Sequence, residues 1–118
     1  PEAHPVIDKN GSRFARATQM TWQEGNAPAG EIKALFVDQQ RGYNTFLVRM
    51  APGAMLRPHR HADVEESYLL EGDLLVSGVE MKAGDYCRAE PGSLHAGVTT
   101  RGGCVFITVC SQRDELLA

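Results

Sequence analysis

From residue 30 onward, short runs rich in aliphatic, β-branched and aromatic residues alternate with glycine, proline, asparagine and aspartate. Runs of this length, divided by turn residues, predict strands rather than helices. The expected strands cover residues 32–37, 43–50, 66–70, 74–77, 79–81, 86–89, 95–100 and 105–109. Their regular spacing is typical of an all-β sandwich or barrel. Only residues 113–117 have the composition of a helical turn.

The 118 residues are expected to form a single domain, with a barrel over residues 30–112. Turn residues such as Asn10-Gly11 interrupt the first 29 residues, so we expect short strands and loops there. Glu71-Gly72-Asp73 is predicted to be a turn that ends the strand over 66–70. Trp22 is expected to pack in the core or at an edge; the alternative is a lid over the barrel mouth.

Candidate chemistry is concentrated in the stretch from Gly53 to Gly72. His59 and His61 are two residues apart, so in an extended strand they point the same way, about 6–7 Å apart along the chain. Glu65 follows after a short link that leads into the next strand. Two imidazoles and a carboxylate are ligands that a divalent transition metal accepts. An exposed histidine pair in a basic turn is the simpler interpretation of His-x-His alone.

The spacing of these residues resembles the first cupin motif, Gly-x5-His-x-His-x3-Glu-x6-Gly, at every fixed position. Residues 84–95, Gly-Asp-Tyr-Cys-Arg-Ala-Glu-Pro-Gly-Ser-Leu-His, resemble the second motif. Six residues instead of five separate Gly84 from Pro91, Pro-Gly replaces Pro-x-Gly, and Thr99 stands where an asparagine is usual. None of these departures affects a ligand position.

The resemblance implies a cupin barrel, a double-stranded β-helix or jelly roll of two antiparallel sheets. It also implies one divalent transition metal ion, Fe(II), Zn, Mn or Ni, held by four ligands: His59, His61, Glu65 and His95. Glu66 is the alternative to Glu65, because such families tolerate a shift of one residue. Cupins of this size are often homodimers, so a homodimer is expected.

Alternation along the expected strands predicts which side chains face the cavity. Met55 and Arg57 would share the inward face of His59 and His61. Ser67 and Leu69 would face inward with Glu65, and Gly97 and Thr99 with His95. Arg57 is the candidate catalytic residue, a guanidinium that would hold an anionic substrate oxygen. The alternative is a surface arginine at the barrel rim.

Composition narrows the classes of partner. A net charge of −3, without a block of basic residues, argues against a nucleic-acid surface. No apolar run reaches the ~18 residues that a membrane helix needs. The N-terminus lacks the pattern of a signal peptide, so the cytoplasm is the expected location. The partner we expect is a small-molecule substrate or ligand.

Cys87, Cys104 and Cys110 are an odd number of cysteines without metal-binding spacing, so free and mostly buried thiols are expected. Cys87 lies next to the second motif and could line the cavity.

Two functions remain open. The sequence of residues 84–95 is similar to that of a mixed group of cupins. The group includes the cupin lobe of ChrR anti-sigma factors and small diketone-cleaving dioxygenases. The first hypothesis is a metal-dependent dioxygenase that acts on a compact dicarbonyl or enolisable substrate. The second is a sensing or regulatory cupin. Residues 1–52 contain no cysteine and one histidine, His4, so the N-terminal zinc domain of a ChrR-type regulator is not expected, which favours the enzyme.

Overall fold

The computed structural model describes residues 5–25 and 30–116. Its strands are β1 (Val6–Lys9), β2 (Ser12–Ala15), β3 (Gln23–Glu24), β4 (Gly30–Asp38), β5 (Tyr43–Met50), β6 (His59–Arg60), β7 (Glu65–Val76), β8 (Val79–Lys82), β9 (Tyr86–Ala89), β10 (Leu94–His95), β11 (Cys104–Ser111) and β12 (Glu115–Leu116). A single turn of 3-10 helix, η1 (Ala17–Gln19), precedes β3. Among the described residues, no helix is long and apolar enough to cross a membrane.

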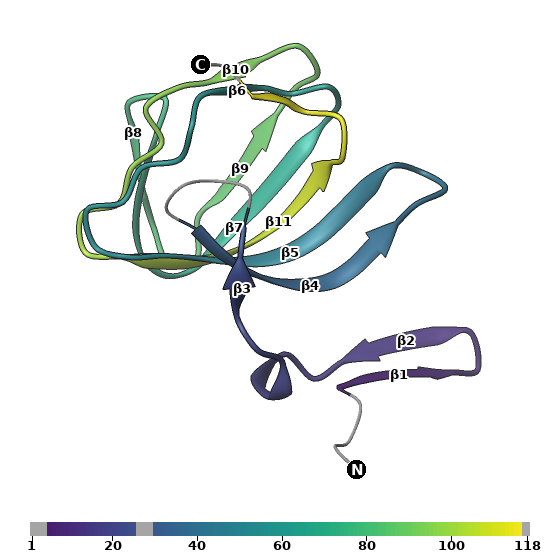
Figure 1. Ribbon diagram of the computed structural model, residues 1–118. Coiled ribbons are helices and arrows are strands. Elements are labelled where there is room, and N and C mark those ends of the chain that lie inside the picture. The colour runs from purple at the N-terminus through teal and green to yellow at the C-terminus, as the bar shows by residue number, and fades with distance from the viewer. Residues whose placement is uncertain (1–4, 26–29, 117–118) are drawn as a thin grey trace.

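Two antiparallel sheets enclose the interior of the barrel (Figure 1). The large sheet has the order β3-β4-β5-β11-β7-β8, and β9 also pairs with β7. The small sheet has the order β10-β6-β12. The arrangement confirms the predicted all-β jelly roll.

Two predicted strands have the expected bounds, because alternation and turn residues agree there. β5 and β9 coincide with the predicted 43–50 and 86–89. In β7, Leu69 is fully buried while Tyr68 and Leu70 are exposed, which confirms the alternation counted from Glu65.

The predicted turn at residues 71–73 is wrong, because β7 continues through it to Val76. Gly72 adopts a φ of +84°, and the register between β7 and β11 shifts close by, as in a β-bulge. The Asp73 carboxylate then accepts hydrogen bonds from the N–H groups of Arg101 and Gly102, at 2.7 and 2.8 Å. Asp73 therefore ties the continuing strand β7 to the turn before β11 and does not end the strand.

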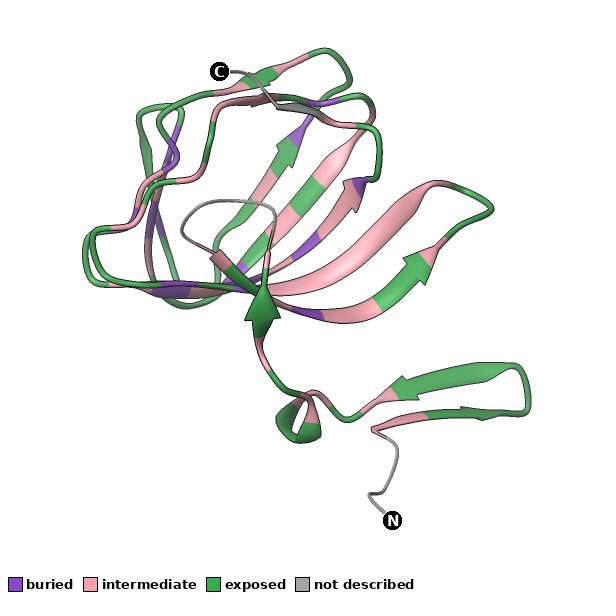
Figure 2. Cartoon of the chain, viewed as in Figure 1, coloured by how far each residue is buried: buried purple, intermediate pink, exposed green. Residues whose placement is uncertain are grey.

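The core lies between the two sheets. Buried side chains come mainly from β5, β7 and β11, with additions from β8 and the loop before Thr99: Val48, Met50, Leu69, Leu74, Val76, Met81, Val98, Cys104 and Phe106. The β1–β2 hairpin lies apart from the barrel and is mostly exposed (Figure 2). Its tip, Asn10-Gly11, has positive φ at both residues, as a two-residue hairpin turn requires.

The C-terminal segment is extended instead of helical. Glu115 and Leu116 form β12, which pairs with β6, so the predicted helical turn over 113–117 is wrong where the chain is described; Leu117 lies outside the described residues. This pairing places the chain around Asp114 beside the candidate histidines.

Candidate metal centre

The two sequence motifs meet in the small sheet. His59 in β6 lies directly opposite His95 in β10. The His61 N–H donates to the Ser93 carbonyl at 2.9 Å, and the Gly92 N–H donates to the His61 carbonyl at 2.7 Å. Backbone pairing between residues more than thirty positions apart thus brings three imidazoles together.

The fourth candidate ligand comes from the large sheet. Glu65 is the first residue of β7, and the loop from Ala62 to Val64 carries the chain to it from His61. Glu66 points elsewhere: it is exposed, and its carboxylate accepts a hydrogen bond from the Tyr86 hydroxyl at 2.6 Å. The structure therefore brings Glu65, and not Glu66, to the histidines.

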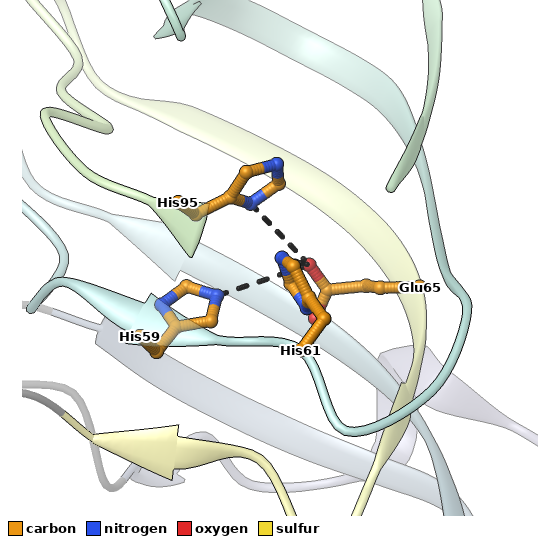
Figure 3. Close-up of side chains that lie close together, drawn as sticks. All are labelled: His59, His61, Glu65 and His95. Carbon is orange, nitrogen blue, oxygen red and sulfur yellow. Dashed lines mark ion pairs between the residues drawn. The ribbon is translucent and has the colours of Figure 1, made fainter. Parts of the chain in front are cut away.

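The four side chains converge on one point (Figure 3). One ligand atom from each of His59, His61, Glu65 and His95 lies within 4.8 Å of the others. Glu65 Oε2 is 3.5 Å from His61 Nε2, 3.7 Å from His95 Nδ1 and 4.0 Å from His59 Nε2. The imidazole planes are nearly perpendicular to one another. Such a cluster offers three nitrogens and one oxygen to a single ion.

Local contacts influence the proton position and the pKa of two of the imidazoles, His59 and His95. His59 Nδ1 is 3.0 Å from the Arg57 carbonyl, so a proton on Nδ1 leaves Nε2 free to face Glu65. The Glu65 carboxylate raises the pKa of His59, although burial opposes this. Burial lowers the pKa of His95, and the neighbouring His61 lowers it further. A neutral imidazole is the form that binds a metal.

His61 provides the test of whether these residues fit a metal ion. It is 1% exposed, and neither of its ring nitrogens has a hydrogen-bond partner among the described residues. A buried polar atom without a partner is unfavourable by about 1–3 kcal/mol. A cation bound at Nε2 would remove this penalty at that nitrogen, so the cluster fits a divalent metal.

A cavity of about 230 Å³ extends from this cluster into the barrel. Three candidate ligands, His59, Glu65 and His95, form part of its wall. The rest is largely apolar, with a few polar groups: Gly25, Gly30, Ile32, Asn44, Phe46, Val48, Leu56, Ser67, Leu74, Val76, Met81, Cys87, Val98, Phe106, Thr108 and Cys110. Ser67 and Thr108 join their hydroxyls in a hydrogen bond of 3.1 Å.

Two of the three thiols belong to this wall. Cys87 lines the cavity as expected, and Cys110 lines it too. Burial raises the pKa of both thiols, that of Cys110 to about 12. Cys104 is buried elsewhere in the core. All three cysteines are free.

The inward direction predicted for four residues differs from the structure. Met55 is 55% exposed, and Arg57 is exposed and absent from the cavity wall, since residues before β6 form no continuous strand. Strand β10 also ends at His95 instead of residue 100. Val98 consequently faces the cavity, whereas Gly97 is exposed and Thr99 does not line the wall.

Trp22 packs at the edge of the large sheet. The Lys33 ammonium lies over its ring, 4.6 Å from the ring centre, and so does the Arg49 guanidinium, at 4.4 Å. It does not line the cavity, so edge packing is the correct interpretation. His4 lies outside the described residues.

Sequence reasoning missed Asp114, whose carboxylate lies 3.5 Å from His61 Nδ1. The partners are 53 positions apart, and no motif connects them. In the sequence, Asp114 is simply one acidic residue outside both motifs.

A family model described as the ChrR cupin-like domain matches residues 10–113. No curated protein sequence matches the chain.

Solved structures with the same fold include an acetylacetone dioxygenase of Acinetobacter johnsonii, with a TM-score of 0.75 and 16% identity over 82% of this chain and 72% of that one. A candidate acetylacetone dioxygenase of Methylibium petroleiphilum aligns with a TM-score of 0.84 and 17% identity, over 95% and 85% of the two chains. A cupin-like protein of unknown function from Ralstonia eutropha has a TM-score of 0.68 and 23% identity, over 76% of this chain and 59% of its own.

Proposed function

The chain belongs to the ChrR cupin-like domain family, and we propose that it is a small metal-dependent dioxygenase. It would bind one divalent transition metal ion through four ligands, His59, His61, Glu65 and His95. Its substrate would be a compact dicarbonyl or enolisable molecule. We favour iron among the candidate metals, because the proposed reaction needs a redox-active ion.

The observation that carries this proposal is the position of the ligands in the cavity wall. At about 230 Å³ the cavity is smaller than the roughly 300–1,000 Å³ typical of drug-sized ligands, so it suits a compact molecule. Three of the four ligands face this space, so a molecule bound there would lie beside the ion. The names of two structural neighbours, both referring to acetylacetone, support a β-diketone.

The chain's own residues would position the substrate and exclude water. Phe46, Val48 and Phe106 give the cavity an apolar side that suits the carbon skeleton of a diketone. Glu65, held at the start of β7, would place its carboxylate next to the three imidazoles. Bound iron would supply Lewis acidity and electrons for dioxygen, whereas zinc supplies Lewis acidity alone.

Oxygen uptake tests the proposal. We expect the Fe(II)-loaded protein to consume dioxygen when pentane-2,4-dione is added, and the zinc-loaded protein to consume none. Glu65→Ala should abolish uptake and lower metal content strongly. Glu66→Ala is the matched control, because it removes the adjacent carboxylate, which accepts a hydrogen bond from Tyr86. It should leave metal content unchanged. Iron-loaded protein that neither binds the diketone nor takes up oxygen would exclude the dioxygenase.

A role for the Arg57 guanidinium is tested in the same assay. Its side chain is exposed, so it would have to turn inward to reach the substrate. If it does, Arg57→Lys should raise KM more than it lowers kcat. Unchanged kinetics would leave Arg57 as a rim residue.

The family match favours a second candidate, a sensing or regulatory cupin. In that case the metal would respond to a small ligand or oxidant without turnover. Metal-loaded protein that binds a small molecule in calorimetry, but consumes no oxygen, would make this the leading function.

A further inference from the structure

Asp114 lies between β11 and β12, where the C-terminal segment passes beside β6. Its Oδ1 accepts a hydrogen bond from the Ala62 N–H at 2.9 Å, and this bond links Asp114 to the loop between His61 and Glu65. Its Oδ2 is 3.5 Å from His61 Nδ1. The side chain is 16% exposed, so it is largely shielded from water.

The His61 ring thus lies between two carboxylates. Nε2 faces Glu65 Oε2 and Nδ1 faces Asp114 Oδ2, both at 3.5 Å. These distances exceed the usual 2.7–3.2 Å of a hydrogen bond, and neither nitrogen has another partner among the described residues. A carboxylate accepts and never donates when ionised, so Asp114 favours the tautomer with the proton on Nδ1. That tautomer leaves the Nε2 lone pair directed at the ligand cluster.

The negative charge of the two carboxylates also favours a cation bound to this cluster. Within the described chain, no lysine or arginine lies within 4.0 Å of the Asp114 or Glu65 carboxylate. With neutral imidazoles, the two carboxylates give the cluster a formal charge of −2. Largely buried charges are unfavourable unless they are paired, and one divalent cation would neutralise both.

We propose that Asp114 is a positioning residue of the metal centre: it holds His61 by Nδ1 so that Nε2 binds the ion. This inference rests on the metal site of the proposed function and adds a residue outside both sequence motifs. Carboxylates that orient a ligating histidine typically change metal affinity by about 10- to 100-fold when they are replaced. The existing bond to Ala62 fixes Asp114 in place before any ion is bound.

Asp114→Asn separates positioning from structural support. The amide oxygen can still accept the Ala62 N–H, but the negative charge facing Nδ1 is lost. Asp63→Asn is the matched control, because Asp63 likewise accepts a backbone N–H in this loop, that of Val64 at 2.8 Å, but lies outside the ligand cluster. Zinc affinity would be measured by competition with a chromophoric chelator, and the thermal midpoint of each metal-free protein would be recorded.

We expect Asp114→Asn to weaken zinc binding at least tenfold, with a metal-free midpoint like that of the unmodified chain. Asp63→Asn should bind zinc normally. In cobalt-loaded protein, the ligand-field absorption should change in Asp114→Asn and not in Asp63→Asn. Equal zinc affinities of Asp114→Asn and the unmodified chain would overturn this inference alone. An unmodified chain that binds neither zinc nor cobalt would overturn the proposed function as well.

Discussion

Gly72 closes the first motif, seven positions after Glu65, and the structure shows why a side chain is excluded there. Its φ is +84°, a region that L-residues with a Cβ rarely adopt. A Cβ at this position would overlap the Gly103 carbonyl oxygen and come within 2.8 Å of Cys104 Cα. Both atoms belong to the backbone around the start of β11, so neither can move without opening the pair of strands.

Gly78 provides a matched comparison. It has almost the same φ, +79°, in the turn between β7 and β8, yet a Cβ there would meet no described atom within 4 Å. Replacement by alanine should therefore be unfavourable only through backbone strain, about 1 kcal/mol. At Gly72 the overlap adds roughly 1–3 kcal/mol. Loss of the hydrogen bond from the Asp73 N–H to the Gly103 carbonyl, 3.3 Å long, adds about 1 kcal/mol.

We thus expect Gly72→Ala to lower the free energy of unfolding by about 3–5 kcal/mol, a large part of the 5–15 kcal/mol typical of a domain. At roughly 4 °C per kcal/mol for a chain of this size, Tm should fall by about 12 °C or more, against about 4 °C for Gly78→Ala. Thermal unfolding by circular dichroism with a chelator present measures this without a contribution from bound metal. Equal losses in the two variants would refute the argument from close packing.

Three other expectations concern residues outside the ligand cluster. The N–H groups of Arg101 and Gly102 lower the pKa of Asp73, so the stability that this carboxylate contributes is present above the unfolded value of about 3.9 and is lost as pH falls through the lower folded value. Asp73→Asn should therefore be less stable than the unmodified chain at pH 7, and the difference in Tm should shrink as pH falls below about 3.9. Burial raises the pKa of Cys110 to about 12, so iodoacetamide at pH 8 should label Cys110 slowly in folded protein and quickly in urea, as mass spectrometry would show; rapid labelling of the folded chain would contradict this. Ile7 and Phe14 face each other on an exposed hairpin, and a hairpin is only marginally stable alone. If the predicted homodimer uses this surface, Phe14→Asp should give monomers in light scattering. Val79→Asp, at the exposed start of β8, should not.

The parts of the fold that could be predicted from the sequence are those fixed by local pattern. β5 and β9 have the predicted bounds because their alternation and flanking turn residues agree. His59, His61 and Glu65 could be chosen from their short spacing, and His95 from the resemblance of residues 84–95 to the second cupin motif. Glu65 was preferred to Glu66 on spacing, and the structure directs the two carboxylates to opposite faces of β7, as a period of two requires.

The parts that could not be predicted depend on contacts between distant segments. Glycine flanked by acidic residues has the composition of a turn, and only pairing with the distant strand β11 keeps Gly72 within a strand, next to a register shift at Leu70. Val98 faces the cavity because β10 ends at His95, so counting by two from that residue fails. Asp114 reaches Ala62 across 52 positions, a separation for which no local pattern exists.

The candidate ligands come from both sheets, so a bound ion would link the two. His59 and His95 belong to two-residue strands of the small sheet, whereas Glu65 belongs to the long strand β7 of the large one. Short strands make few ladder hydrogen bonds, so an ion that both sheets bind would contribute much to holding them together. Any divalent ion that binds the folded chain better than the unfolded chain stabilises it by mass action, whether or not it is redox-active. Stabilisation by zinc without oxygen uptake would therefore support the metal site. It would leave the enzyme proposal intact, because the test of that proposal is oxygen uptake by the iron-loaded protein.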